Sequence, residues 1–310
     1  MLRGMSTGAP STGAPSTEAP SVGTAVEPEP LHPLLDGLID DAGLFPPARL
    51  PMIEALEAHL RHRSGPHAAM LGRFLCPASR LGELIAALDG RVGADDDVAL
   101  GLICDTGLDR LGTALEVIAS EPRLLLSLLE YPLPAEAPDL AAEAQRVVDV
   151  LPPIEGYVEL PRVAQWPAAL AVLADSPYGA KLRTGGTTAT AFPSEAEVAR
   201  FLEACVLNEV PFKCTAGLHH AVRHTDAETG FEHHGFLNVL LAVEAAAHGA
   251  GLREVENLLA ERDATELARR AEQLDPTEAV IARSFFVAFG SCSFDEPVED
   301  LLALGLIPEE

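Results

Sequence analysis

The sequence is nearly without lysine. Of its 21 lysines and arginines, only Lys181 and Lys213 are lysines. A guanidinium group stays charged, whereas an amine can lose its proton and attack a carbonyl group to form a Schiff base. The two lysines each begin a similar short motif. Their retention therefore indicates chemistry that needs an amine. The alternative is a composition bias that removed the other lysines and left these two by chance.

Other absences narrow the class of protein. The five cysteines are scattered and form no Cys-x-x-Cys pair, which argues against a disulfide framework or a zinc ribbon and fits a reducing cytoplasm. No apolar stretch is long enough to span a bilayer. A net charge of −26 repels phosphate backbones and anionic lipids, so we expect neither nucleic acid nor membrane as a partner. The expected partner is a small-molecule substrate, and assembly into a homo-oligomer is left open.

The first 30 residues differ in composition from the rest. They repeat Ser-Thr-Gly-Ala-Pro and Ser-Thr-Glu-Ala-Pro, and Arg3 is their only Lys or Arg. Such a segment has too little apolar surface to offset its ordering entropy, and it lacks the apolar core of a signal peptide. We predict a disordered tail over 1–30 and a single domain over 31–310.

Within 31–310, short apolar runs alternate with longer helical patterns, which is typical of repeated β-α units and a parallel sheet. The predicted strands are 38–40, 69–76, 98–104, 124–129, 156–160, 179–183, 211–215 and 284–290. The predicted helices are 52–61, 79–88, 108–120, 140–150, 166–174 and 194–207, with a closing helix at 297–304. Eight strands predict a (β/α)8 TIM barrel, with a helical insertion at about 219–283 that carries helices 237–247, 252–261 and 265–273.

Charged residues lie where these strands end, which is where (β/α)8 barrels carry their active sites. Side chains alternate along a strand, so Lys181 and Arg183 share one face, and Lys213 can face the interior with them. Two ammonium groups in one apolar mouth repel each other, and we therefore expect the pKa of one lysine to fall toward neutrality. The predicted catalytic residues are Lys181, Lys213, Glu159, Glu130 and Asp40. The alternative is a layer of charges that only fills the barrel.

The two lysine phrases resemble a known family. Lys-Leu-Arg-Thr-Gly at 181–185 resembles the sixth strand of deoxyribose-phosphate aldolases, and Lys-Cys-Thr-Ala-Gly at 213–217 resembles their seventh. The resemblance implies that Lys181 forms the Schiff base and that Lys213 lowers its pKa. Gly290-Ser291 resembles the glycine-rich eighth strand of that family, which helps to bind substrate phosphate. The chain departs from the family at Arg183, in the histidine-rich loop and in the long insertion.

The function we expect is a class I aldolase-type lyase acting on a small anionic carbonyl compound, with no metal or other cofactor. The predicted substrate-binding residues are Arg183, Gly185, Gly186, Arg73, His219, His220, Gly290 and Ser291. Cys292, next to Ser291, is the one cysteine that we single out as a candidate for reactivity.

Five histidines within sixteen residues follow the second lysine phrase, namely His219, His220, His224, His233 and His234. Their density suggests a divalent metal ion, although the pattern is not His-Glu-x-x-His. One alternative function is therefore a metal-dependent hydrolase or isomerase that uses this loop. Another is a non-catalytic barrel that binds a ligand, in which the lysines are members of ion pairs.

Overall fold

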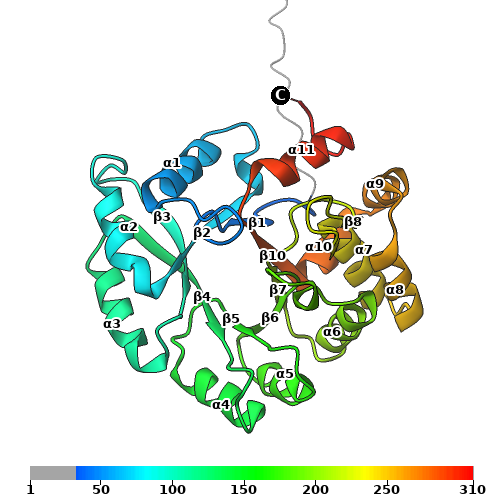
Figure 1. The fold of residues 1–310 in the computed structure, drawn as a ribbon, viewed down its shortest axis with the longest axis horizontal. Coiled ribbons are helices and arrows are strands. Elements are labelled where there is room, and N and C mark those ends of the chain that lie inside the picture. The colour runs from blue at the N-terminus through cyan, green and yellow to red at the C-terminus, as the bar shows by residue number, and fades with distance from the viewer. Residues whose placement is uncertain (1–32, 310) are drawn as a thin grey trace, which may run out of the picture. The chain divides into compact units, whose positions relative to one another are not determined.

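The computed structural model describes residues 33–309 (Figure 1). The predicted tail at 1–30 lies outside the described residues. Among those described, no helix is both long enough and apolar enough to cross a membrane.

Eight parallel strands close into a barrel in the order β1-β10-β7-β6-β5-β4-β3-β2, and Figure 1 shows the helices arranged around them. The predicted (β/α)8 fold is confirmed. The barrel strands are β1 (Ile39–Asp41), β2 (Leu71–Pro77), β3 (Val98–Ile103), β4 (Leu124–Pro132), β5 (Gly156–Glu159), β6 (Gly179–Arg183), β7 (Phe212–Thr215) and β10 (Phe286–Ser291).

The outer helices alternate with these strands, as the apolar periodicity predicts. They are α1 (Met52–Arg63), α2 (Leu81–Leu88), α3 (Leu108–Ala119), α4 (Leu140–Val150), α5 (Trp166–Ala174), α6 (Glu195–Leu207) and α11 (Asp295–Ala303), with three short 3-10 helices at η1 (Ala68–Met70), η2 (Ala78–Arg80) and η3 (Ala189–Ala191). Ser194 caps α6 in a capping box with Glu197, so the backbone amides of both residues find side-chain partners.

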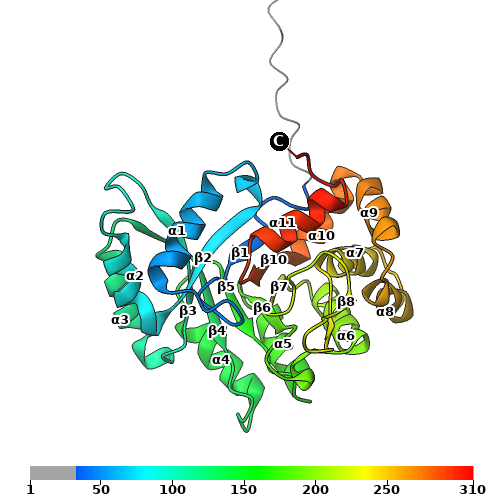
Figure 2. The same ribbon diagram turned by 45° about the horizontal axis from the view of Figure 1, so that its top comes forward.

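The segment between β7 and β10 holds a hairpin and four helices. These are β8 (His224–Thr225), β9 (Glu232–His233), α7 (Phe236–Ala247), α8 (Leu252–Ala260), α9 (Ala264–Gln273) and α10 (Pro276–Phe285). α7 contacts β10, and Figures 1 and 2 show α8 and α9 outside α7. The predicted start of the last strand at residue 284 is wrong. Asp275 and Glu278 form a capping box that starts α10, with Pro276 as the first helical residue, and this helix continues through Phe285.

The apolar core is divided in two by the barrel wall. A large cluster fills the space between strands and helices, and a small one inside the barrel consists of Ala42, Leu75, Leu128 and Tyr157. Glycine makes room for this inner layer, because a Cβ at Gly101 would lie 2.4 Å from the side chain of Leu75. Charged side chains occupy the rest of the interior, and they form the candidate site.

Candidate active site

The two lysines converge on one carboxylate. Lys181 on β6 is the register partner of Lys213 on β7, and both side chains are buried. Glu130 on β4 reaches between them: its Oε2 lies 2.5 Å from the Lys181 amine and its Oε1 lies 2.7 Å from the Lys213 amine. Glu130 therefore joins two cations that would otherwise repel each other.

On the solvent side, Lys181 is connected to the surface through Glu159. Glu159 Oε2 lies 3.0 Å from the Lys181 amine, and its Oε1 accepts a 2.9 Å hydrogen bond from Arg183 Nε. The side chain of Arg183 is 52% exposed, whereas that of Lys181 is 4% exposed. A solute that approaches this end of the barrel therefore meets the guanidinium before it meets the amine.

On the other side, Lys213 is held by Asp40. The Lys213 amine donates to Asp40 Oδ2, and Asp40 Oδ1 accepts a 2.7 Å hydrogen bond from the backbone amide of Arg73. The Arg73 guanidinium lies 3.8 Å from Asp40 and 2.5 Å from Glu155, whose other oxygen accepts from Tyr157 at 3.0 Å. The Lys213 amine also lies 5.6 Å from the centre of the Tyr157 ring, in a cation–π arrangement.

These contacts form one continuous line of alternating charge through the barrel. In order, it runs Glu155, Arg73, Asp40, Lys213, Glu130, Lys181, Glu159 and Arg183. The anions and the cations are equal in number, so the line is neutral when every member is ionised. Neutrality explains how such deeply buried charges are tolerated, since a buried charge is costly unless it is paired.

The pairing corrects the expectation that repulsion lowers the pKa of a lysine. Burial alone lowers the pKa of Lys181, but the adjacent Glu130 and Glu159 outweigh it and raise this pKa above its usual value. Burial raises the pKa of Glu130, but Lys181 and Lys213 together bring it down to about 2. Lys181 and Arg183 lower the pKa of Glu159 in the same way, against the effect of burial. The Lys181 amine is therefore protonated at neutral pH.

The Thr-Gly part of each lysine phrase has a packing explanation. The amide of Thr184 donates to the carbonyl of Thr215 at 2.9 Å, and its hydroxyl donates to the carbonyl of Ala216. A Cβ at Gly185 would lie 2.9 Å from Gly217 Cα, so only glycine allows the two loops to approach this closely. The next residue, Gly186, is exposed.

Gly290 and Ser291 occupy the end of β10. A Cβ at Gly290 would lie 3.2 Å from Leu75 and 3.4 Å from Thr215 Oγ1, which places this glycine at the interior wall. Ser291 is buried, and its hydroxyl donates to the carbonyl of Ser293 at 2.6 Å. The Ser291 hydroxyl is therefore engaged within its own turn.

Two of the histidines after β7 pair with α11. His219 Nδ1 lies 2.9 Å from Glu296 and His220 Nδ1 lies 3.1 Å from Asp300. His224 and His233 face each other across the hairpin, and His234 is buried and hydrogen-bonded to the carbonyl of Pro193 at 2.8 Å. Within residues 33–309, no three metal-ligating atoms that include one from this loop all lie within 4.8 Å of one another. The geometry therefore gives the metal alternative no ligand set in the loop.

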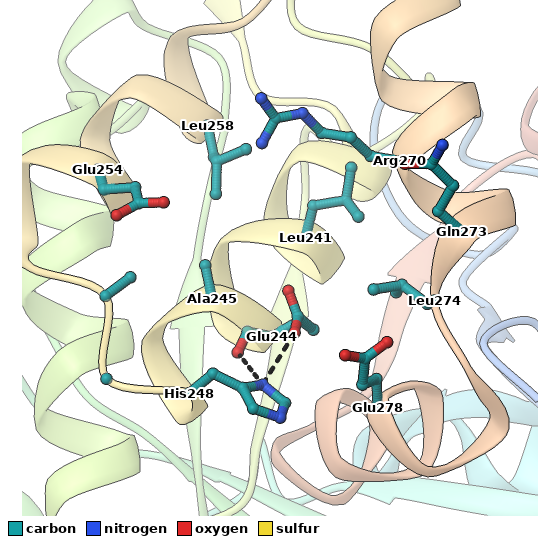
Figure 3. A pocket seen from close by; sticks show the side chains of 12 residues that line it. Leu241, Glu244, Ala245, His248, Glu254, Leu258, Arg270, Gln273, Leu274 and Glu278 are labelled. Carbon is teal, nitrogen blue, oxygen red and sulfur yellow. Dashed lines mark hydrogen bonds and ion pairs between the residues drawn. The ribbon is translucent and has the colours of Figure 1, made fainter.

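A trio that meets this distance lies elsewhere, in a cavity of about 530 Å³ among α7, α8, α9 and α10. Figure 3 shows Glu244 and His248 of the α7 end facing Glu278 of α10. His248 Nδ1 lies 2.8 Å from Glu244, and burial, helped by the nearby Glu278, raises the pKa of Glu244 despite this histidine. The ion pair of His248 with Glu244, with Glu278 nearby, accounts for this group at the cavity.

Glu155 and Tyr157 were missed as members of the interior line. The signal was present, because Glu155, Tyr157 and Glu159 recur at every second residue and so share one face of the strand. Glu155 directly precedes β5, so the sequence pattern assigns it to a loop rather than to the barrel interior.

The residues predicted to be catalytic thus gather in one interior line, together with Arg183 and Arg73, while His219 and His220 pair with α11. Comparison of the chain with protein-family models, with curated proteins and with solved structures found no match.

Proposed function

We propose that the protein is a lysine-dependent carbon–carbon lyase of the class I aldolase type that acts on a small anionic carbonyl compound. The observation that carries this proposal is the convergence of both lysines on Glu130, with Glu159 and Arg183 leading from Lys181 to solvent. Active sites of (β/α)8 barrels lie at the carboxyl ends of the strands, and Glu159 and Arg183 are the last residues of β5 and β6.

The first step is loss of a proton from the Lys181 ammonium. Glu159 is the acceptor we propose, because it contacts the amine at 3.0 Å and lies on the solvent side. The free amine then attacks the carbonyl carbon, and the carbonyl oxygen takes up one proton from the amine and the proton held by Glu159 before it leaves as water, which ionises Glu159 again. The product is a cationic imine on Lys181.

Cleavage follows from the electron demand of that imine. A carboxylate removes the proton of the β-hydroxyl group, the bond between the α and β carbons breaks, and its electron pair moves into the imine to give an enamine. Glu159 is the base that we propose for this step, and Lys213, paired with Asp40 and Glu130, stabilises the carboxylates. Arg183 offers a half-exposed guanidinium to an anionic group of the substrate.

Borohydride trapping tests the proposal. Incubation with a small aldehyde or keto acid and borohydride should add the mass of one reduced adduct at Lys181, identified by peptide mapping, which also separates labelling of the amino terminus. Lys181→Arg keeps the charge and should abolish this adduct. Arg110→Lys adds an exposed amine and measures the background reactivity of an ordinary lysine.

A second candidate is favoured by the complete pairing of the buried charges. In a non-catalytic ligand-binding barrel, Lys181 is a permanently protonated member of the ion-pair line, which agrees with its raised pKa. Labelling of Lys181 no faster than the lysine of the Arg110→Lys variant would favour this candidate over the lyase.

A further inference from the structure

A cysteine outside the line of alternating charge lies at the carboxyl end of the barrel. Cys292 follows β10 directly and is partly exposed. Its sulfur lies 3.8 Å from Nε2 and 3.9 Å from Nδ1 of His219, which comes from the loop after β7. Because the two distances are nearly equal, the sulfur faces the imidazole ring as a whole rather than one of its nitrogens.

His219 is held in its charged form on its other side. Its Nδ1 lies 2.9 Å from Glu296 Oε2 of α11. Burial lowers the pKa of His219, but Cys292 and Glu296 outweigh it and raise this pKa to about 9. The other titratable neighbours are His220, which pairs with Asp300, and His233, whose pKa burial lowers to about 4. At neutral pH an imidazolium therefore faces the sulfur.

The remaining four cysteines provide a contrast within the same chain. Cys76, Cys104, Cys205 and Cys214 are buried. Burial raises the pKa of Cys76 and of Cys104 to about 12, and it raises the pKa of Cys205 and Cys214 well above the usual value. These thiols are protonated and shielded from solvent, so they are unreactive in the folded protein.

We propose that Cys292 is a nucleophilic thiolate, paired with the imidazolium of His219 and oriented through Glu296, and that it is a modification site for small uncharged electrophiles at the carboxyl end of the barrel. Glu296 and Asp300 flank the two histidines in a chain of net charge −26, which disfavours anionic electrophiles. The imidazolium of His219 beside the sulfur disfavours cationic ones, so the class that remains is uncharged. The site does not depend on the lysine chemistry proposed above.

The chemistry needs no oxidant or cofactor. With an α,β-unsaturated aldehyde, the thiolate sulfur forms a bond to the β carbon, and the electron pair of the double bond moves through the carbonyl to give an enolate. The imidazolium of His219 can deliver the proton that this enolate takes up, and solvent then reprotonates the imidazole. With iodoacetamide, a sulfur–carbon bond forms and iodide leaves.

The test is the rate of alkylation of the folded full-length chain by iodoacetamide, followed by peptide mass spectrometry between pH 5.5 and 9. Cys292 should be labelled first, with the four buried cysteines unlabelled until the protein is unfolded. At pH 6.5 its rate should exceed that of free cysteine by roughly tenfold, because a larger thiolate fraction is partly offset by the weaker nucleophilicity of a stabilised thiolate. The rate should also vary little with pH across the range in which free cysteine gains thiolate.

Two variants and one matched control assign the effect. His219→Gln should reduce the rate at pH 6.5 to that of free cysteine and restore an ordinary thiol pH profile. His220→Gln removes a histidine that pairs with α11 in the same way but contacts no cysteine, and it should leave the rate unchanged. Thermal melting of each variant verifies that it is folded. If His219→Gln does not fold, Glu296→Gln keeps the imidazole, weakens its positive charge and should reduce the rate to a smaller extent.

The proposal is overturned if wild-type Cys292 reacts at the rate and with the pH profile of free cysteine. It is also overturned if folded His219→Gln, or folded Glu296→Gln where the former does not fold, reacts as fast as wild type. Faster reaction of a buried cysteine than of Cys292 has the same consequence.

Discussion

Lys181 and Lys213 are register partners on adjacent strands, and a single carboxylate, Glu130, bridges their amines. Lys181 also contacts Glu159, and Lys213 also contacts Asp40. Two buried ammonium groups therefore coexist because carboxylates alternate with them. The consequence for chemistry is that the amine must be freed from its carboxylates before it can act as a nucleophile.

The pH dependence of borohydride trapping should reflect this pairing. Because Glu130 and Glu159 raise the pKa of Lys181 despite its burial, labelling should increase as the pH is raised through the alkaline range. Glu159→Gln removes one of the two carboxylates and should move the profile to lower pH. Glu155→Gln changes the far end of the line and does not contact Lys181, so its profile should match wild type. Identical profiles for wild type and Glu159→Gln would contradict the proposal that Glu159 raises the pKa of Lys181.

Asp40 should contribute strongly to stability. It is fully buried and contacts both the Lys213 amine and the Arg73 amide, so Asp40→Asn removes one of the two carboxylates that pair with the buried Lys213 amine. Loss of one partner of a buried ion pair costs about 3–5 kcal/mol, which urea unfolding can measure. Glu83→Gln disrupts an exposed pair with Arg80 and should leave the urea midpoint unchanged. A similar midpoint for both variants would show that the interior pair is dispensable.

Substitution of Gly185 tests whether this glycine is needed for packing or for anion binding. In Gly185→Ala the new methyl group would lie 2.9 Å from Gly217 Cα and 3.0 Å from Phe192, and overpacking of this kind costs about 1–3 kcal/mol. Gly112→Ala, on the exposed face of α3 with no atom within 4 Å, should stabilise the protein by about 0.5–1 kcal/mol. Calorimetry compares the two variants. Unchanged stability in Gly185→Ala would leave anion binding as the reason for this glycine.

The fold could be predicted from the sequence because the patterns that indicate its helices and strands are local. β6, α4 and α5 have the bounds that the apolar pattern predicts, and Ser194 forms the capping box expected at the start of α6. The start of β10 was misplaced because Phe285 and Phe286 are equally apolar, although the first belongs to a helix and the second to a strand. The capping box at Asp275 was the local signal that identifies this helix.

Only part of the candidate site could be predicted from the sequence. Strand alternation places Lys181 and Arg183 on one face. Glu130 and Asp40 were predicted at the ends of their strands, but they lie within β4 and β1, which continue to Pro132 and Asp41. Their partners could not be predicted, because closure of the barrel brings Asp40 to Lys213 across 173 residues of sequence. The direction of the pKa shift of Lys181 depends on those partners, and the repulsion argument was wrong because it left out the carboxylate between the lysines.

His219 makes the stability of the protein depend on pH above neutrality. Its pKa in the folded state is raised to about 9 by Cys292 and Glu296 against the opposing effect of burial, from an ordinary value of 6.5. A group whose pKa rises on folding contributes stability that is fully present below its unfolded pKa and is lost as the pH rises through its folded pKa. The free energy of unfolding should therefore fall between about pH 6.5 and 9, and His219→Gln should make this part of the profile flatter. Urea unfolding at a series of pH values measures both curves, and parallel curves would show that the imidazolium is not held by Glu296.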